Sequence, residues 1–247
     1  MSKTYEVNKL SFPVLALCIG VYLLANILAN LNMGVSIDPL YRALDLNFSP
    51  ISFYGNIIPL VLIYIGYKLI APYWFTSFKN WYLIRKNRSA LREQLLSLLK
   101  YTIVYTVISW IITVIVLQVF MPVHFINPYK GVFSYLNNYL ADFLLLLITI
   151  IYNYGLVLLP LIVAFLVKNN WQVLVISIVI NFFLPILLFM LRILPENLMP
   201  INLMYEFVNG VGATTNYEFL TLGILAIVII EVTIIIAIYN YKESSEF

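Results

Sequence analysis

Long apolar runs separated by short polar stretches dominate this chain of 247 residues. Six runs approach the roughly 20 residues that a helix needs to cross a bilayer, and none shows the alternation typical of membrane strands. We therefore predict an all-α, polytopic membrane protein with six transmembrane helices in a single transmembrane domain, residues 1–247. The predicted spans are Ser11 to Met33, Ser52 to Ile70, Tyr101 to Phe120, Tyr139 to Val167, Gln172 to Leu191, and Phe219 to Asn240.

The composition agrees with this pattern and excludes a soluble globular protein. Hydrophobic residues make up 63% of the chain and charged residues 10%, against roughly 45–50% and about 25% in ordinary soluble domains. Outside the predicted spans no stretch has the size of a soluble catalytic domain, roughly 100–150 residues. We expect a multi-pass protein of the cell membrane, of bacterial type.

The distribution of basic residues predicts the orientation. The most polar stretch, Thr76 to Lys100, separates spans two and three and has Glu93 as its single acid. Its basic residues are Lys79, Arg85, Lys86, Arg88, Arg92 and Lys100. Loops rich in Lys and Arg stay in the cytoplasm, so six crossings place both termini there as well. Only Arg42, Lys130 and Arg192, of the 14 basic residues, then fall outside.

The last external segment, 194–218, is too apolar for a plain loop and too broken for a span. It has the sequence LPENLMPINLMYEFVNGVGATTNYE, in which Pro195, Pro200, Gly210 and Gly212 interrupt any helix. Irregular backbone at membrane depth is tolerated where protein covers it. We therefore predict a re-entrant extracellular hairpin between spans five and six.

The chain lacks the residues of the common catalytic and metal sites. His124 is the only histidine and Cys18 the only cysteine, and no G-x-x-x-x-G-K-[ST] phosphate loop occurs. Zinc sites and Cys/His nucleophile pairs need more such residues, and a nucleotide site needs that loop. We expect no catalytic residues, no metal site, no cofactor and no enzymatic activity in this chain.

The segment from Tyr73 to Lys100 predicts a helix, a break and a second helix on the cytoplasmic surface. Its first half has aromatic residues at helical spacing, Asn87 to Ser89 supplies cap residues, and a leucine stripe then leads into span three. The candidate coupling residues are Lys79, Arg85, Lys86, Arg88 and Arg92. Two interpretations stay open: the basic residues dock a soluble ATPase, or they only set topology and bind anionic lipid.

A few polar residues fall inside the predicted spans. Glu231 lies in the middle of span six, where a charge is costly, so it faces protein or water. It is either a packing contact to an asparagine or tyrosine, or part of a translocation path or proton relay. Asn26 and Asn30 form a polar stripe on span one, which either packs against a helix or contacts substrate. Asp142 is interpreted as an interfacial residue.

The layout resembles the ABC-2 type transporter permeases. The features that carry the resemblance are six spans with both termini inside, a basic cytoplasmic elbow and a proline-broken hairpin before the last span. The most specific stretch, FKNWYLIRKNRSALREQLLSLLK, is similar to the coupling region of small Firmicute permeases of bacteriocin, lantibiotic and phenol-soluble modulin systems. A large extracellular domain and a long amphipathic helix before span one are absent from the sequence, which disfavours polysaccharide export.

The resemblance implies a permease subunit of an ATP-binding cassette exporter. It would pair with a second permease copy, identical or homologous, and with an ATPase subunit that binds ATP and Mg. Its cargo would be hydrophobic or amphipathic peptides, with membrane lipids as further contacts and no nucleic acid. Two alternatives remain, an ion- or proton-coupled secondary transporter that uses Glu231 and a non-transporting bacteriocin immunity membrane protein.

Overall fold

Five long helices form nearly all of the structure in a computed structural model that describes residues 12–33, 53–76, 88–120, 137–167, 169–192, 231–233 and 235. They are α1 (Phe12–Met33), α3 (Phe53–Thr76), α5 (Arg88–Phe120), α6 (Asn138–Leu166) and α7 (Asn170–Met190). Residues 231–233 and 235 are also helical. No strand occurs in these ranges, which confirms the all-α prediction for this part of the chain.

Two of these helices contain segments long and apolar enough to cross a membrane. The segments are Leu91–Val116 within α5 and Tyr139–Leu166 within α6. Shorter apolar segments are Phe12–Val21, Ile57–Ile70 and Asn170–Leu184. The structure thus contains two candidate membrane spans, while six spans and their orientation stay predictions. The predicted hairpin of 194–218 and most of span six lie outside the described residues.

The two helices that flank the basic segment are longer than the predicted spans. α3 continues beyond Ile70, through Pro72, to Thr76, although we predicted a separate surface helix from Tyr73. α5 begins at Arg88, among the predicted cap residues Asn87 to Ser89, and continues without a break into predicted span three. Its first turns bury Leu91 and Leu98 in the protein core, so packing keeps them helical before the continuous apolar run begins. Residues 77–87 lie outside the described ranges.

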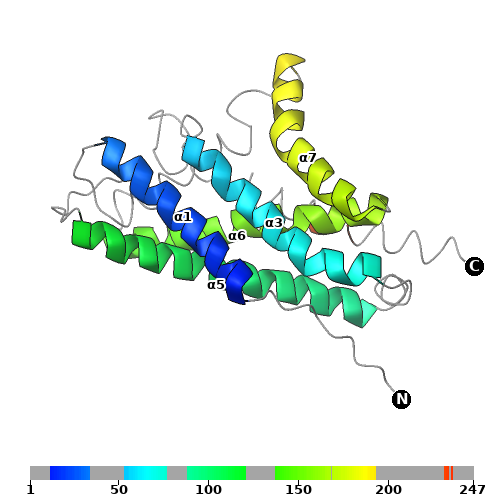
Figure 1. The fold of residues 1–247 in the computed structure, drawn as a ribbon, viewed down its shortest axis with the longest axis horizontal. Coiled ribbons are helices and arrows are strands. Elements are labelled where there is room, and N and C mark those ends of the chain that lie inside the picture. Colours follow the sequence, from blue (N-terminus) through cyan, green and yellow to red (C-terminus); the bar gives the residue numbers. More distant parts are fainter. Residues whose placement is uncertain are drawn as a thin grey trace, which may run out of the picture.

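The helices form an antiparallel bundle in which α6 is central. It contacts α3, α5 and α7, while α1 packs against α3 and α5. Consecutive helices alternate in direction, and the end of α7 turns away from the other helices (Figure 1). Each of α3, α5 and α6 buries apolar side chains in one shared core, for example Leu62, Leu69, Leu98, Leu158 and Leu161.

A glycine on α3 permits the closest approach between α3 and α6. A Cβ atom placed on Gly66 would overlap the carbonyl oxygen of Val157 and lie 3.1 Å from its carbonyl carbon. The contact falls one residue after Leu156, whose carbonyl loses its usual partner because the buried Pro160 has no N–H. The two helix backbones therefore meet at the turn that the proline weakens.

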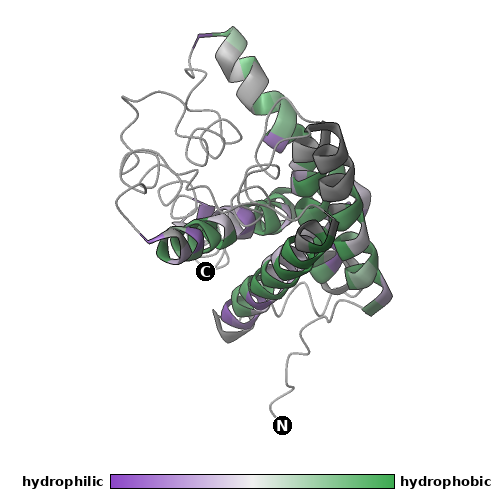
Figure 2. Cartoon of the chain, turned by 90° about the vertical axis from the view of Figure 1, so that its left-hand side faces the viewer, coloured by the Kyte–Doolittle hydropathy of each residue, from purple (hydrophilic) through white to green (hydrophobic). Residues whose placement is uncertain are grey.

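Over residues 102–119 the polarity of α5 is largely the reverse of that in a soluble protein. Its exposed apolar residues include Ile103, Ile108, Ile111, Ile115 and Val119. Its buried polar residues are Gln94, Thr102, Thr106, Ser109 and Thr113. The helices are hydrophobic along most of their length (Figure 2). An apolar outer face with polar groups turned inward is the arrangement that a lipid environment favours.

Candidate functional site

The most concentrated group of buried polar side chains lies between α5 and α6. On α5, Thr102, Thr106, Ser109 and Thr113 recur every three or four residues and therefore share one face of the helix. On α6, Asp142, Thr149 and Asn153 are buried and recur with spacings of seven and four, which also places them on one face. We call the five residues Thr106, Ser109, Thr113, Thr149 and Asn153 the polar seam.

One direct hydrogen bond joins the two sides of the polar seam. The Nδ2 atom of Asn153 donates to the Oγ1 atom of Thr106 at 3.0 Å, and both side chains are buried. The bond connects residues 47 positions apart. It places Thr106 and Asn153 at the same level, and a shift of one helix along the other would break the bond.

The hydroxyl groups of this region fall into two classes. Thr102 and Thr149 each donate to the carbonyl oxygen four residues earlier, at 2.8 Å in both cases. Ser109 and Thr113 make no such bond, and their buried hydroxyl oxygens have no hydrogen-bond partner among the described residues. The same holds for the amide oxygen of Asn153. A Ser or Thr hydroxyl in a helix can normally donate to the carbonyl oxygen four residues earlier. Ser109 and Thr113 therefore differ from Thr102 and Thr149 in leaving this acceptor unused.

Glu231 lies in a short helical stretch and interacts electrostatically with a tyrosine of α6. Its carboxyl group is near enough to Tyr152 on α6 for its charge to act on the phenol. Its Oε2 atom is buried and has no hydrogen-bond partner in the part of the chain that the structure describes.

The structure describes only some of the other polar residues predicted from the sequence. Asp142 is buried in the second turn of α6, and its location at the membrane interface stays a prediction. Asn26 and Asn30 belong to α1, but their side chains lie outside the described residues. The polar stripe proposed on that helix therefore stays a prediction. Among the described residues no three His, Cys, Asp or Glu side chains gather into a metal-binding group.

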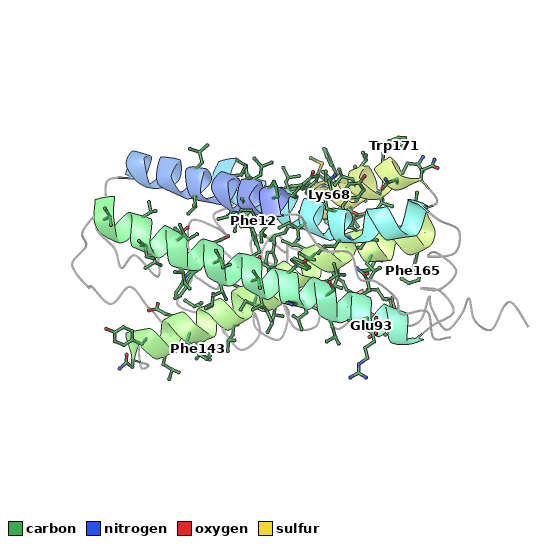
Figure 3. The ribbon with its side chains drawn as sticks, turned by 60° about the horizontal axis from the view of Figure 1, so that its bottom comes forward. Phe12, Lys68, Glu93, Phe143, Phe165 and Trp171 are labelled. Atoms are coloured by element: carbon green, nitrogen blue, oxygen red, sulfur yellow. The ribbon has the colours of Figure 1, made fainter. Side chains whose placement is uncertain are left out.

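The basic segment meets the bundle at the start of α5. Arg88 is the first residue of the helix and Arg92 is exposed one turn later. Lys68, Glu93, Phe165 and Trp171 lie toward the same end of the bundle, with Phe143 toward the other (Figure 3). Of the remaining predicted coupling residues, Lys79, Arg85 and Lys86 lie outside the described ranges, as does the side chain of Arg88.

Two hydrogen bonds tie the first turns of α5 to its neighbours. The buried Gln94 donates from Nε2 to the carbonyl oxygen of Leu69 on α3 at 3.5 Å. The phenol of Tyr154 on α6 donates to the carbonyl oxygen of Leu95 at 3.2 Å. The start of α5 is therefore attached to α3 and α6, and a displacement of Arg92 would be passed to both helices.

Sequence reasoning missed the polar seam. Ser and Thr recur every three or four residues in 102–113. Their hydroxyls can bond a carbonyl of their own helix, so this spacing alone does not predict a polar contact with another helix. Asn153 carried the clearer signal, as an amide inside an apolar run. Comparison of the chain with known protein families, with curated proteins and with solved structures finds no match.

Proposed function

We propose that this chain is the membrane-spanning permease subunit of an ATP-binding cassette exporter of the ABC-2 type. In this proposal it crosses the membrane six times with both termini in the cytoplasm. It moves hydrophobic or amphipathic peptides outward, paired with a second permease copy and driven by a separate ATPase subunit. The lack of a phosphate loop in the sequence means that ATP and Mg belong to that partner.

The observation that carries the proposal is the continuity of α5. One helix of 33 residues begins at Arg88, exposes Arg92, and continues into an apolar segment that can cross a membrane. Gln94 and Tyr154 connect its first turns to α3 and α6. A soluble ATPase that bound the basic end would therefore push on three helices at once, without a flexible joint within 88–120.

The other long helices have lengths that suit the proposal. α1, α3 and α7 contain 22, 24 and 21 residues, and at about 1.5 Å per residue each is slightly longer than the roughly 30 Å of a hydrocarbon core. An outer surface rich in Ile, Leu and Phe would offer an apolar peptide dispersion contacts and little selection by charge. This supports peptides over small ions as cargo.

The proposal is tested by binding of the ATPase. The permease is co-expressed with the ATP-binding cassette protein encoded beside it, and retention of the ATPase on the purified permease is measured together with peptide export. We expect Arg88→Glu/Arg92→Glu to lose most of both, because truncating a partly buried interfacial ion pair costs about 2–5 kcal/mol. Full retention and full export by this variant would overturn the proposal.

Two controls separate docking from topology. A reporter fused to the C-terminus monitors orientation, because removal of basic residues can invert spans. The double reversal Arg42→Glu/Lys130→Glu changes the same amount of charge on the predicted outer side and should leave ATPase retention unchanged. Loss of retention in both double variants would indicate a general electrostatic effect and would count against the docking site.

One observation favours a second function. Glu231 has a buried carboxyl oxygen with no hydrogen-bond partner among the described residues, and its charge acts on Tyr152. Acids at membrane depth often serve proton or ion movement. An ion- or proton-coupled secondary transporter is therefore the alternative. A genetic neighbourhood without an ATP-binding cassette gene, together with export driven by a pH gradient, would favour it.

A further inference from the structure

α6 lacks one backbone hydrogen bond in the middle of the bundle. Pro160 lies inside this helix, which runs from Asn138 to Leu166. Because proline has no N–H, the carbonyl oxygen of Leu156 has no donor four residues later, and the proline ring also crowds that carbonyl. Bends in helices concentrate at prolines for this reason. The turn 156–160, which we call the proline turn, is therefore easier to bend than the rest of α6.

α6 is attached to α5 differently on the two sides of the proline turn. Before the turn, Asn153 donates to the hydroxyl of Thr106. The phenol of Tyr154 donates to the carbonyl oxygen of Leu95, so two directional contacts hold this part of α6 on α5. After the turn, residues 161–166 have the sequence LIVAFL and contain no polar side chain. Their side chains can make only apolar contacts, which have no preferred direction.

The contact of α3 with the proline turn is between backbones. A Cβ atom on Gly66 would overlap the carbonyl oxygen of Val157, so no side chain of residue 66 is inserted there. Small residues let helix backbones touch without interlocking side chains, and rotation about such a contact needs little repacking. Beyond the turn, α6 is followed by α7 after residues 167–169 only, and the two helices pack together. The far end of α7 turns away from the other helices (Figure 1).

We propose that the proline turn is a hinge, about which the last turns of α6 move together with α7 relative to α5. The part of α6 before the turn stays with α5, because hydrogen bonds join them. Leu166 is six residues beyond Pro160, about 9 Å along the helix, so a bend of about 20° would move it by about 3 Å. Displacements of this order accompany conformational switches. The inference depends only on the described helices and does not require the permease proposal.

Distances from pulsed EPR test the hinge with two pairs of spin labels. In a Cys18→Ala background of the full chain, Leu96→Cys is paired with Leu166→Cys, which lies beyond the proline turn. Ile115→Cys is paired with Phe143→Cys, which lies before it. All four labelled positions are between 54% and 68% exposed, so label mobility is matched, and the pairs flank the hydrogen bond that joins α5 to α6. We expect the distances of the first pair to spread about 3 Å more widely than those of the second.

Pro160→Leu separates bending of the helix from motion of the label. The leucine N–H restores the missing donor for the Leu156 carbonyl, so this variant should narrow the distances to residue 166 and leave the second pair unchanged. Equal spreads of the two pairs in the parent protein would overturn the hinge. A static kink would shift the mean distance in Pro160→Leu without changing its spread, and this result would overturn the hinge as well.

The comparison of the two label pairs in the parent protein decides the matter even if Pro160→Leu does not fold. Both measurements use the chain without an ATPase, so their failure is distinct from failure of the proposed function.

Discussion

The amide nitrogen of Asn153 lies 3.0 Å from the hydroxyl oxygen of Thr106, and this is the direct side-chain bond between α5 and α6 in the polar seam. Both residues are buried, so neither side chain can exchange its partner for bulk water. The bond therefore favours one rotation and one relative level of the two helices. Apolar packing alone would tolerate several, because leucine and isoleucine side chains carry no directional contacts.

A double-mutant cycle should measure this contact. Thr106→Val and Asn153→Leu are made singly and together, and the free energy of unfolding is determined for each. We expect a coupling energy of about 0.6 kcal/mol, with about 1.7 kcal/mol as the upper end for hydrogen bonds between membrane helices. Additive losses, with no coupling, would show that the bond does not hold α5 against α6.

Gly66→Ala should destabilise the protein by about 1–3 kcal/mol, the range for forcing extra atoms into a packed interior. The added methyl group would overlap the backbone of Val157, which cannot move aside as a side chain can. Gly20→Ala is the matched control, since nothing lies within 4 Å of a Cβ at that helical glycine. Thermal unfolding of the two variants should therefore differ in sign, with Gly20→Ala neutral or stabilising by up to about 1 kcal/mol. Equal stabilities would contradict the close approach of α3 and α6.

The sequence was a good guide to features encoded within one helix. The limits of α1, α6 and α7 fall within two residues of the predicted spans, because a long apolar run and its polar ends are local properties. The start of α5 agrees with the cap residues predicted at Asn87 to Ser89, whereas α3 continues past its predicted end at Ile70 to Thr76.

Features that depend on a second helix were not predictable in the same way. The sequence around Gly66 does not predict that Val157, 91 positions later, lies against it. The bond from Asn153 to Thr106 likewise needs the packing of α5 on α6, and the hydroxyl residues on α5 were not predicted to form a polar face. Residues 77–87 of the basic segment lie outside the described ranges, so their helical structure stays a prediction.

Asn137→Ala should shorten or loosen the start of α6. The Asn137 side chain accepts a hydrogen bond from the backbone N–H of Tyr139 at 3.0 Å, and loss of such a cap costs about 0.5–2 kcal/mol. Amide hydrogen exchange over residues 138–141 should accelerate, with a smaller change further along α6. Asn137→Ser keeps an oxygen acceptor and should restore slow exchange. Fast exchange in the serine variant as well would contradict the capping role.

Glu231→Gln separates packing from proton transfer. The amide has the shape of the carboxyl group without its charge, so a packing residue next to Tyr152 should tolerate the change, with export and thermal stability close to the parent. We expect this outcome if an ATPase drives transport. The measurement is peptide export by cells and pH-gradient-driven uptake by inside-out vesicles. Loss of gradient-driven transport in a correctly folded variant would instead assign Glu231 to a proton relay.

If α6 crosses a membrane, as proposed, its length has a consequence for the lipid around the protein. Its apolar segment of 28 residues extends about 42 Å as a straight helix, against a hydrocarbon thickness of roughly 30 Å. A helix with that excess must tilt, bend or thicken the adjacent bilayer, and Pro160 provides a place to bend. Hydrophobic mismatch therefore acts on the turn where Gly66 and Val157 meet, so acyl-chain length becomes a variable that sets how tightly α3 and α6 are pressed together.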